Sequence, residues 1–442
     1  MTRNQRAVAL LLLASLNAFG FMDRVVVSLV TQQLKAEFLF TDTDIGLLVG
    51  TGFAVVNAIA AIPIAWLAER FKRAHVAAAF LMIGSLFTAL AGMTASVIQL
   101  LICRLGMATG SAATEAPPHS IISDIYPPER RASAISIFML GVPVAAIFGS
   151  FAGGAIAQSY GWRNTFLFFG LFGAAISLLC FAFLKEPERR TAGHETGPRP
   201  GTLHVISVML GSRAIVFIML GACFISFASF GVNTFLPALL VRAFGLDTAQ
   251  AGLVFGLISG IASMVGTLAG GYASEYLARR DPRWLLGFPA LGSFIGAPLF
   301  IIGASCGSLM VGGPLMLVGC FAFYMAMGPC IATLHGSLDS YTRATGSALF
   351  LLVMHLVGQG LGPPLIGKLS DVFAGMLYSG HFAADCAGAA AQVPHSACAA
   401  ASASGLRDAV MVSASFHFAA GAMLFLAARA AYAAARSART QG

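Results

Sequence analysis

The feature that most constrains this sequence is a succession of twelve long apolar stretches. A helix needs about 20 mostly apolar residues to cross a bilayer. The stretches lie near residues 7–35, 44–69, 75–94, 97–125, 132–158, 163–184, 213–242, 247–277, 284–305, 308–336, 344–371 and 406–433. Only 10% of the residues are charged, whereas soluble domains carry about 25%. The sequence therefore predicts an all-α integral membrane protein with twelve transmembrane helices.

The formal net charge is +8, and its distribution argues for a membrane rather than for nucleic acid. With the N-terminus inside, most basic residues fall in loops on one side. They cluster at Arg70/Lys72/Arg73, Arg130/Arg131, Arg189/Arg190 and Arg279/Arg280/Arg283. Cytoplasmic loops carry such an excess of Lys and Arg. We expect both termini in the cytoplasm of a bacterium and the protein in its cytoplasmic (inner) membrane.

One hydrophilic break, KEPERRTAGHETGPRPG at 185–201, divides the chain. We expect an N-terminal six-helix bundle at 1–185, a cytoplasmic linker at 186–203 and a C-terminal six-helix bundle at 204–442. The second bundle includes an Ala-rich external loop at 373–405, which holds Cys386 and Cys398. Disulfides persist on that side of the membrane. The sequence leaves open whether these two cysteines are bonded.

The two halves repeat one loop signature. AWLAERFKRAH (65–75) follows span two, and GGYASEYLARRDPR (270–283) follows span eight. Each places an acid, Glu69 or Glu275, at the end of a helix and follows it with arginines, namely Arg70 and Arg73 in the first loop and Arg279 in the second. Such loops are predicted to clamp neighbouring helix ends as a conformational latch. They resemble the signature motif of the major facilitator superfamily, with Ala65 and Glu69 replacing its Gly and Asp. The resemblance implies two pseudo-symmetric six-helix halves.

Charged residues inside spans are costly and usually functional. Asp23 and Arg24 lie mid-way along span one. As neighbours on a helix they point about 100° apart, so at least one should meet another helix. The functional interpretation is that Asp23 carries a proton while Arg24 steers an anion or gates Asp23. The alternative is a structural ion pair that locks this span.

Span four carries Arg104 and Glu115, eleven residues or about three turns apart, which predicts that both project from one face. An acid in such a setting can carry a proton, and Arg104 is a candidate lining or helix-pinning residue. Pro117 and Pro118 should kink the helix. His119 next to them is either a proton-passing group or a packing residue.

The second half offers polar residues of no fixed charge. Its candidate substrate-binding or gating residues are Asn233, Tyr324, His335, His355 and Gln359, each with packing as the alternative. This asymmetry predicts that the first half handles coupling and that the second half shapes a more apolar binding surface.

Four segments resemble the spinster-like branch of the superfamily, in its bacterial form. They are FMDR (21–24), HSIISDIYPPERRASAISI (119–137), FLPALLVRAFGLDTAQAGLVFGLISGIASMVGTLAGG (235–271) and GSALFLLVMHLVGQGLGPPLIGKLSD (346–371). The resemblance implies proton-coupled movement of amphipathic lipids such as lysophospholipids and sphingosine phosphates. The Glu of that branch in span four falls on Ser111 here, and Glu115 one turn later is its candidate substitute. His355 stands where the branch commonly has Asn.

These features predict a secondary active transporter of an amphipathic or anionic, lysolipid-like molecule, driven by protons through alternating access. The alternatives are an organic-acid or anion:proton symporter, with Arg24 and Arg104 as carboxylate clamps, and a drug-type exporter. The sequence has no Gly-Lys-Ser/Thr phosphate loop, HExxH or GxSxG. We therefore expect no enzyme activity, no cofactor and no metal. The expected partners are substrate, protons and lipid, and the expected state is a monomer.

Overall fold

The computed structural model describes residues 3–187, 201–339, 342–386 and 396–441, and this part of the chain forms helices without a strand. The first half comprises α1 (Arg3–Leu29), α2 (Thr31–Phe38), α3 (Asp42–Val49), α4 (Thr51–Arg70), α5 (Arg73–Ala91), α6 (Val97–Ala112), α7 (Ala116–Ile125), α8 (Pro128–Met139) and α9 (Gly141–Phe183). The second half comprises α10 (Thr202–Gly211), α11 (Arg213–Phe244), α12 (Thr248–Phe255), the π-helix η1 (Gly256–Ile261), α13 (Ala262–Ala278), α14 (Trp284–Ser305), α15 (Leu309–Phe323), α16 (Met327–Ser337), α17 (Arg343–Leu377), α18 (Phe382–Asp385) and α19 (Ala397–Gln441).

Eleven helical segments of the described chain are long and apolar enough to span a membrane. The longest, Ser133–Phe183, covers 51 residues and contains Gly161, whose φ of 82° and ψ of 168° interrupt the helix. Glycine suits this position because side chains disfavour positive φ. Dividing the segment at Gly161 yields two membrane-length helices, and with them the twelve crossings that the sequence predicts.

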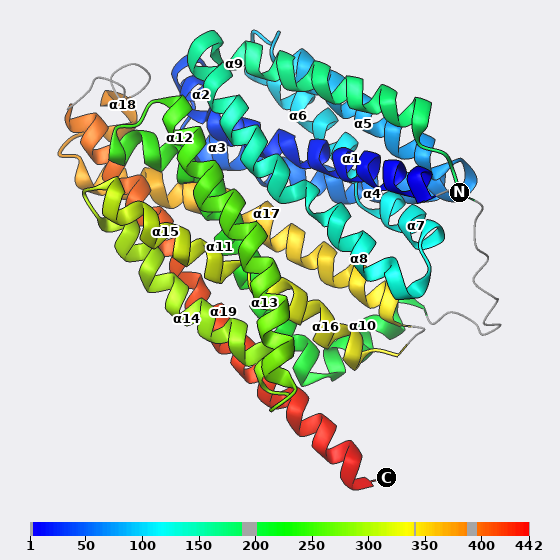
Figure 1. The fold of residues 1–442 in the computed structure, drawn as a ribbon. Coiled ribbons are helices and arrows are strands. Elements are labelled where there is room, and N and C mark those ends of the chain that lie inside the picture. The colour runs from blue at the N-terminus through cyan, green and yellow to red at the C-terminus, as the bar shows by residue number, and fades with distance from the viewer. Residues whose placement is uncertain (1–2, 188–200, 340–341, 387–395, 442) are drawn as a thin grey trace.

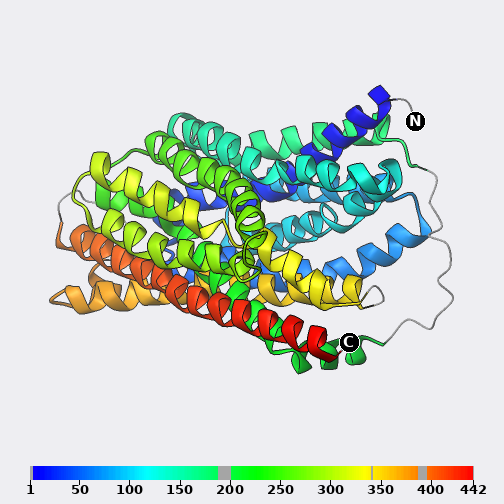
Figure 2. The ribbon, with the colours of Figure 1, turned by 60° about the horizontal axis from the view of Figure 1, so that its bottom comes forward.

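The helices run roughly along one direction and place both termini at the same end of the molecule (Figure 1; Figure 2). We call this end, which also holds α7, α10 and α16, the terminal end. The end that carries α2 and α18 is the far end. Within each half, small residues let helices approach closely. A Cβ placed on Gly110 of α6 would lie 2.5 Å from the Cα of Gly84 in α5.

The two halves meet near the far end along two seams. In the α3–α17 seam, a Cβ on Gly46 would lie 2.4 Å from the carbonyl oxygen of Pro363. In the α9–α12 seam, a Cβ on Gly252 would lie 2.4 Å from the carbonyl oxygen of Ser150. Backbone therefore touches backbone across both seams. The GSFAGG segment (149–154), which includes Ser150, is one wall of the second seam.

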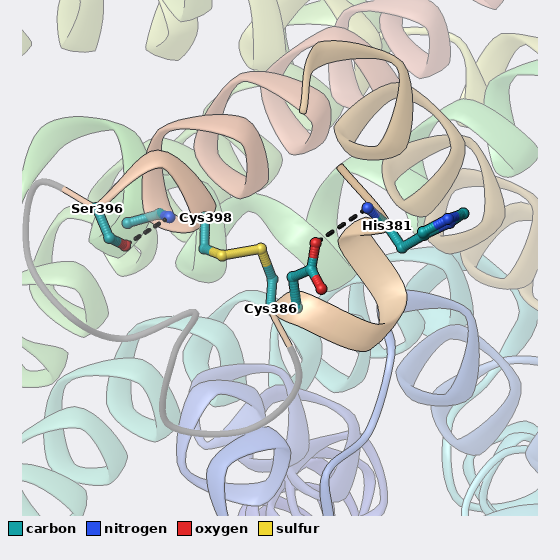
Figure 3. Close-up of a disulfide and its surroundings, with 6 residues drawn as sticks. His381, Cys386, Ser396 and Cys398 are labelled. Carbon is teal, nitrogen blue, oxygen red and sulfur yellow. Dashed lines mark hydrogen bonds between the residues drawn. A yellow bond between two sulfur atoms is a disulfide. The ribbon is translucent and has the colours of Figure 1, made fainter. Parts of the chain in front are cut away.

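The loop between α17 and α19 is shorter than the predicted 373–405. Helix α17 continues to Leu377, and α19 begins at Ala397 because its Ala-rich start has high helix propensity. Residues 387–395 lie outside the described chain, as does most of the predicted linker at 186–203. Cys386 and Cys398 form a disulfide with a Cα–Cα distance of 5.4 Å, and it ties α18 to the first turn of α19 (Figure 3).

This bond gives a simple expected result. Denatured protein that has not been reduced should take up six equivalents of iodoacetamide, because six of the eight cysteines are free. After reduction it should take up eight, and peptide mapping should place the two new adducts on Cys386 and Cys398. Eight adducts before reduction would show that the bond is absent from the purified protein.

Candidate functional site

Two of the crossings are broken at corresponding positions of the two halves. In the fourth crossing, α6 ends at Ala112 and α7 starts at Ala116. In the tenth, α15 ends at Phe323 and α16 starts at Met327. Pro117 and Pro118 follow the first break, and Pro329 follows the second. Proline lacks an N–H donor and favours such interruptions. Broken helices in matching places of two repeats mark the binding site in many transporters, so we place the candidate site between these breaks.

Asp23 and Arg24 turn toward different helices, as adjacent helical residues do. The Asp23 carboxylate is buried and accepts a hydrogen bond of 2.7 Å from Thr88 Oγ1 in α5. Arg24 Nη2 donates to Ser111 Oγ in α6 at 3.4 Å. Asp23 also attracts Arg24 and Arg104 electrostatically. In the described chain, no arginine lies within ion-pair distance of the Asp23 carboxylate, so this carboxylate is not locked in a salt bridge.

Phe53 of α4 is fully buried and lies beneath two guanidinium groups. The Arg24 guanidinium is 5.0 Å from the ring centroid, and that of Arg104 is 4.6 Å away. Arg104 also donates to the backbone oxygens of Leu48 and Asp23, each at 3.3 Å. Cation–π contacts of this kind hold positive charge in an apolar setting.

Glu115 lies at the break of the fourth crossing with its side chain exposed. It attracts Arg24 of the first half and His355 of the second. An exposed acid that acts on both halves lies between them. Arg104 lies over the Phe53 ring and donates to the Asp23 backbone oxygen. The helix is interrupted between these two residues, at 113–115, so the sharing of one face by Arg104 and Glu115 stays a prediction.

Several buried polar atoms of the candidate site have no hydrogen-bond partner. They include Arg24 Nε, Arg104 Nη2 and Gln359 Nε2. Gln359 of α17 is 3% exposed, and its backbone oxygen would lie 2.8 Å from a Cβ on Gly50. All three atoms are donors, and buried donors without partners are costly. Each of the three can therefore still donate a hydrogen bond.

In the second half, three side chains are linked. Asn233 Nδ2 donates to Tyr324 Oη at 2.9 Å, and Ser259 Oγ donates to Asn233 Oδ1 at 2.7 Å. Asn233 and Tyr324 are sequence candidates that the fold brings together. Ser259 was missed, because nothing in the surrounding GLISGI predicts a π-helix.

Three other candidates have local partners. Ser111 Oγ donates to the Gly20 backbone oxygen at 2.9 Å, beside its contact with Arg24. His119 Nδ1 contacts the Glu115 backbone oxygen at 2.7 Å, and its ring stands edge-on to Phe138. His335 Nε2 lies 2.7 Å from Ser347 Oγ, toward the terminal end. The contacts of the two histidines match the packing interpretation.

The predicted latch loops differ between the halves. In the first, Arg73 lies 2.6 Å from Asp124 and 2.8 Å from Glu186, and it ties three crossings together. In the second, Glu275 and Arg279 are 3.6 Å apart and largely exposed on one helix. Arg70 lies 3.8 Å from the Trp66 ring centroid. Exposed pairs contribute little, so the strong clamp belongs to Arg73.

A buried charge cluster joins the halves at the far end. Asp42 accepts from Lys35 at 2.6 Å, from Arg242 through two bonds of 2.7 Å, and from Ser370 at 2.7 Å. We call these residues the Asp42 cluster. Burial and the nearby Arg242 guanidinium lower the pKa of Lys35. Next to the cluster, Asp371 of α17 accepts the backbone N–H groups of Asp42 and Thr43.

The Asp42 cluster was missed at the sequence level. Its acid, Asp42, lies at a helix end, where charge is common, and its partners Arg242 and Ser370 are 200 and 328 residues away. No local spacing signals such a contact.

The profile of the Major Facilitator Superfamily matches residues 11–363. The chain belongs to this superfamily. An MFS-type efflux pump of Mycolicibacterium smegmatis is 29% identical over 81% of this chain and 83% of its own. Protein spinster homolog 1 of mouse and the sphingosine-1-phosphate transporter SPNS2 of zebrafish are each 25% identical, over 84% and 80% of this chain and 74% of theirs.

The fold agrees with that assignment. A crystal structure of a bacterial homologue of the human lysosomal transporter spinster, inward-facing and unoccupied, aligns with a TM-score of 0.85 at 29% identity, covering 97% of this chain and 98% of that one. The inward-facing, occupied structure of a bacterial spinster homologue aligns with a TM-score of 0.83. This protein is a spinster-like membrane transporter, and its family and fold are those of transporters rather than enzymes.

Proposed function

We propose that this spinster-like transporter moves an amphipathic, anionic molecule of lysolipid type across a bacterial cytoplasmic membrane by proton-coupled alternating access. The observation that carries the proposal is Glu115. It is exposed at a helix break, and it acts on Arg24 in one half and His355 in the other. When one half moves relative to the other, the distance from Glu115 to Arg24 or to His355 changes. Alternating access requires such a link between the movement of the halves and a titratable group.

The donors without partners support an anionic substrate. Arg24 Nε, Arg104 Nη2 and Gln359 Nε2 are buried and unsatisfied. A carboxylate or phosphate supplies acceptors to guanidinium groups in a geometry that favours paired bonds. Two arginines against two acids, Asp23 and Glu115, leave no net charge at the site in the free protein. Neutralising one acid by a proton makes the site positive, which favours an anion.

An apolar pocket supports an amphiphile over a small organic acid. Its volume is about 440 Å³, and it is an open surface hollow at the α9–α12 seam, separate from the residues of the candidate site, with wall residues from both halves. The lining is apolar except for one amide: Phe151, Ala155, Leu246, Ala249, Gln250, Leu253, Val254 and Leu309. Such a surface suits an alkyl chain. The zebrafish relative, a sphingosine-1-phosphate transporter, acts on a molecule of the same class.

The positions of basic residues support an orientation with the terminal end in the cytoplasm. If the terminal end faces the cytoplasm, then Arg70, Arg283 and Arg429 lie on the cytoplasmic side, where basic residues gather. The far end, which the Asp42 cluster and the seams close, then faces outward. This corresponds to an inward-facing state, the conformation of both solved spinster homologues.

Proton coupling is tested by substitution of the two acids. In proteoliposomes that contain a pH-sensitive dye, a gradient of 1-oleoyl-lysophosphatidate should drive proton movement through the intact protein. Asp23→Asn and Glu115→Gln should each reduce that movement at least about tenfold while binding is partly retained, because neither amide can release a proton at neutral pH. Asp281→Asn, which alters an exposed loop acid, is the control and should behave as the intact protein.

The outcomes separate the mechanisms. Undiminished proton movement in both acid variants would exclude these carboxylates as the carriers. Proton movement driven by a short carboxylic acid, but not by the lysolipid, would favour an organic-acid symporter. Response to cationic dyes alone would favour drug-type export, which the mycobacterial relative's name suggests.

A further inference from the structure

A chain of hydrogen bonds ends at the break of the tenth crossing. Ser259 Oγ donates to Asn233 Oδ1 at 2.7 Å, and Asn233 Nδ2 donates to Tyr324 Oη at 2.9 Å. The three residues come from η1, from α11 and from the break itself. Ser259 is 3% exposed, whereas Asn233 and Tyr324 are only partly buried. The hydrogen bonds therefore run from a buried serine to a tyrosine that is partly exposed at the break.

The donors and acceptors of these hydrogen bonds all point the same way, from Ser259 toward Tyr324. A side-chain amide has an acceptor at one end and donors at the other. Ser259 occupies the acceptor end of Asn233, so the donor end faces Tyr324. The Tyr324 oxygen accepts that bond, and its own O–H proton stays available. The described contacts of this hydroxyl give that proton no acceptor.

The π-helix explains why Ser259 is in place. Single π turns within α-helices recur at functional sites. Here the turn holds two glycines against the first half, since a Cβ on Gly256 or Gly260 would lie 3.4 or 2.5 Å from atoms of Ile147. The same turn directs Ser259 to Asn233. The π-helix η1 thus packs against the first half and also places Ser259 in hydrogen-bond contact with Asn233.

We infer that Tyr324 is the hydrogen-bond donor that the second half presents to the substrate, and that Ser259 positions it through Asn233. The inference rests on the proposed function and sharpens it. It adds a neutral O–H donor opposite the arginines, and hence a requirement for an oxygen acceptor on the substrate. Tyr324 stands at the break that corresponds to the one carrying Glu115. Ser259 does not touch the substrate.

The test is equilibrium binding of 1-oleoyl-lysophosphatidate to the purified full-length protein in nanodiscs. Tyr324→Phe should weaken binding about tenfold, the usual consequence of losing one hydrogen bond to a charged group. Ser259→Ala should weaken it by several-fold, because the freed amide can rotate and let its oxygen capture the tyrosine proton. Ser259→Thr keeps the hydroxyl and should restore the affinity of the intact protein.

Ser263→Ala is the matched control. Ser263 lies one turn further along, and its hydroxyl donates to the Gly260 backbone oxygen at 2.9 Å. This variant should bind as the intact protein does, and all variants should unfold at similar temperatures. Equal affinity across all variants would overturn the inference and leave the proposed function standing. Weakened binding in Ser259→Thr equal to that in Ser259→Ala would also overturn it. No binding by the intact protein would instead overturn the proposed substrate class.

Discussion

Asp42→Asn is expected to shift the transporter toward a state that is open at the far end. The change removes the only acid of the Asp42 cluster and leaves Lys35 and Arg242 as two partly buried like charges that, within the described chain, only the neighbouring Asp371 still attracts. Breaking a buried pair by removing one partner costs about 3–5 kcal/mol. Opening the far end hydrates both cations and relieves that cost. A closed state favoured by less than this amount should therefore become the minor one.

Spin labels report the shift directly. One label at Tyr160, 71% exposed in the first half, and one at Met310, 89% exposed in the second, flank the far end. Pulsed electron resonance should show a longer distance between them in Asp42→Asn. Asp44→Asn changes an exposed acid in the same helix and should leave the distance unchanged. If the distribution of label-to-label distances in Asp42→Asn were the same as in the intact protein, the Asp42 cluster would not be what keeps the far end closed.

Gly252→Leu is expected to have an effect of similar size through shape rather than charge. A Cβ at this position would lie 2.4 Å from the Ser150 backbone oxygen and 3.0 Å from the Gly154 Cα. Backbone cannot retreat as a flexible side chain does, so the α9–α12 seam cannot close. Transport needs both states, and its rate should fall at least about tenfold while the far end stays open. Overpacking of this kind costs 1–3 kcal/mol or more.

The same label pair and the proteoliposome assay measure this change. Gly252→Ala should give an intermediate result, because one methyl group already conflicts with the Ser150 oxygen. Gly271→Leu is the control on the same crossing, since nothing lies within 4 Å of a Cβ there. A closed far end and an unchanged transport rate in Gly252→Leu would contradict the role of the seam.

Both predictions concern contacts that no local pattern reveals. Asp42 resembles an ordinary helix-end charge in the sequence. Gly252 is one of 49 glycines, most of which could have been assigned to close packing within one half. The α9–α12 seam pairs residues about 100 positions apart, and the Asp42 cluster pairs residues some 200 to 330 apart. Only the docking of two bundles identifies which residues meet.

The residues of the candidate site could be predicted from the sequence only in part. Asp23, Arg24 and Glu115 were found because a charge inside an apolar span is conspicuous. Their partners were not, because Thr88 and Phe53 are unremarkable in their own segments. The expected alignment of Arg104 with Glu115 stays a prediction, since it rests on regular helix geometry that the break at 113–115 interrupts.

By itself, the sequence determined that the chain spans a membrane many times and that its halves repeat. These properties follow from hydrophobic length and charge count, which act segment by segment. The tertiary structure decided which acid faces which half, that both the fourth and the tenth crossing break, and that the far end is closed. These depend on distances between segments remote in the chain, and such distances are set by packing.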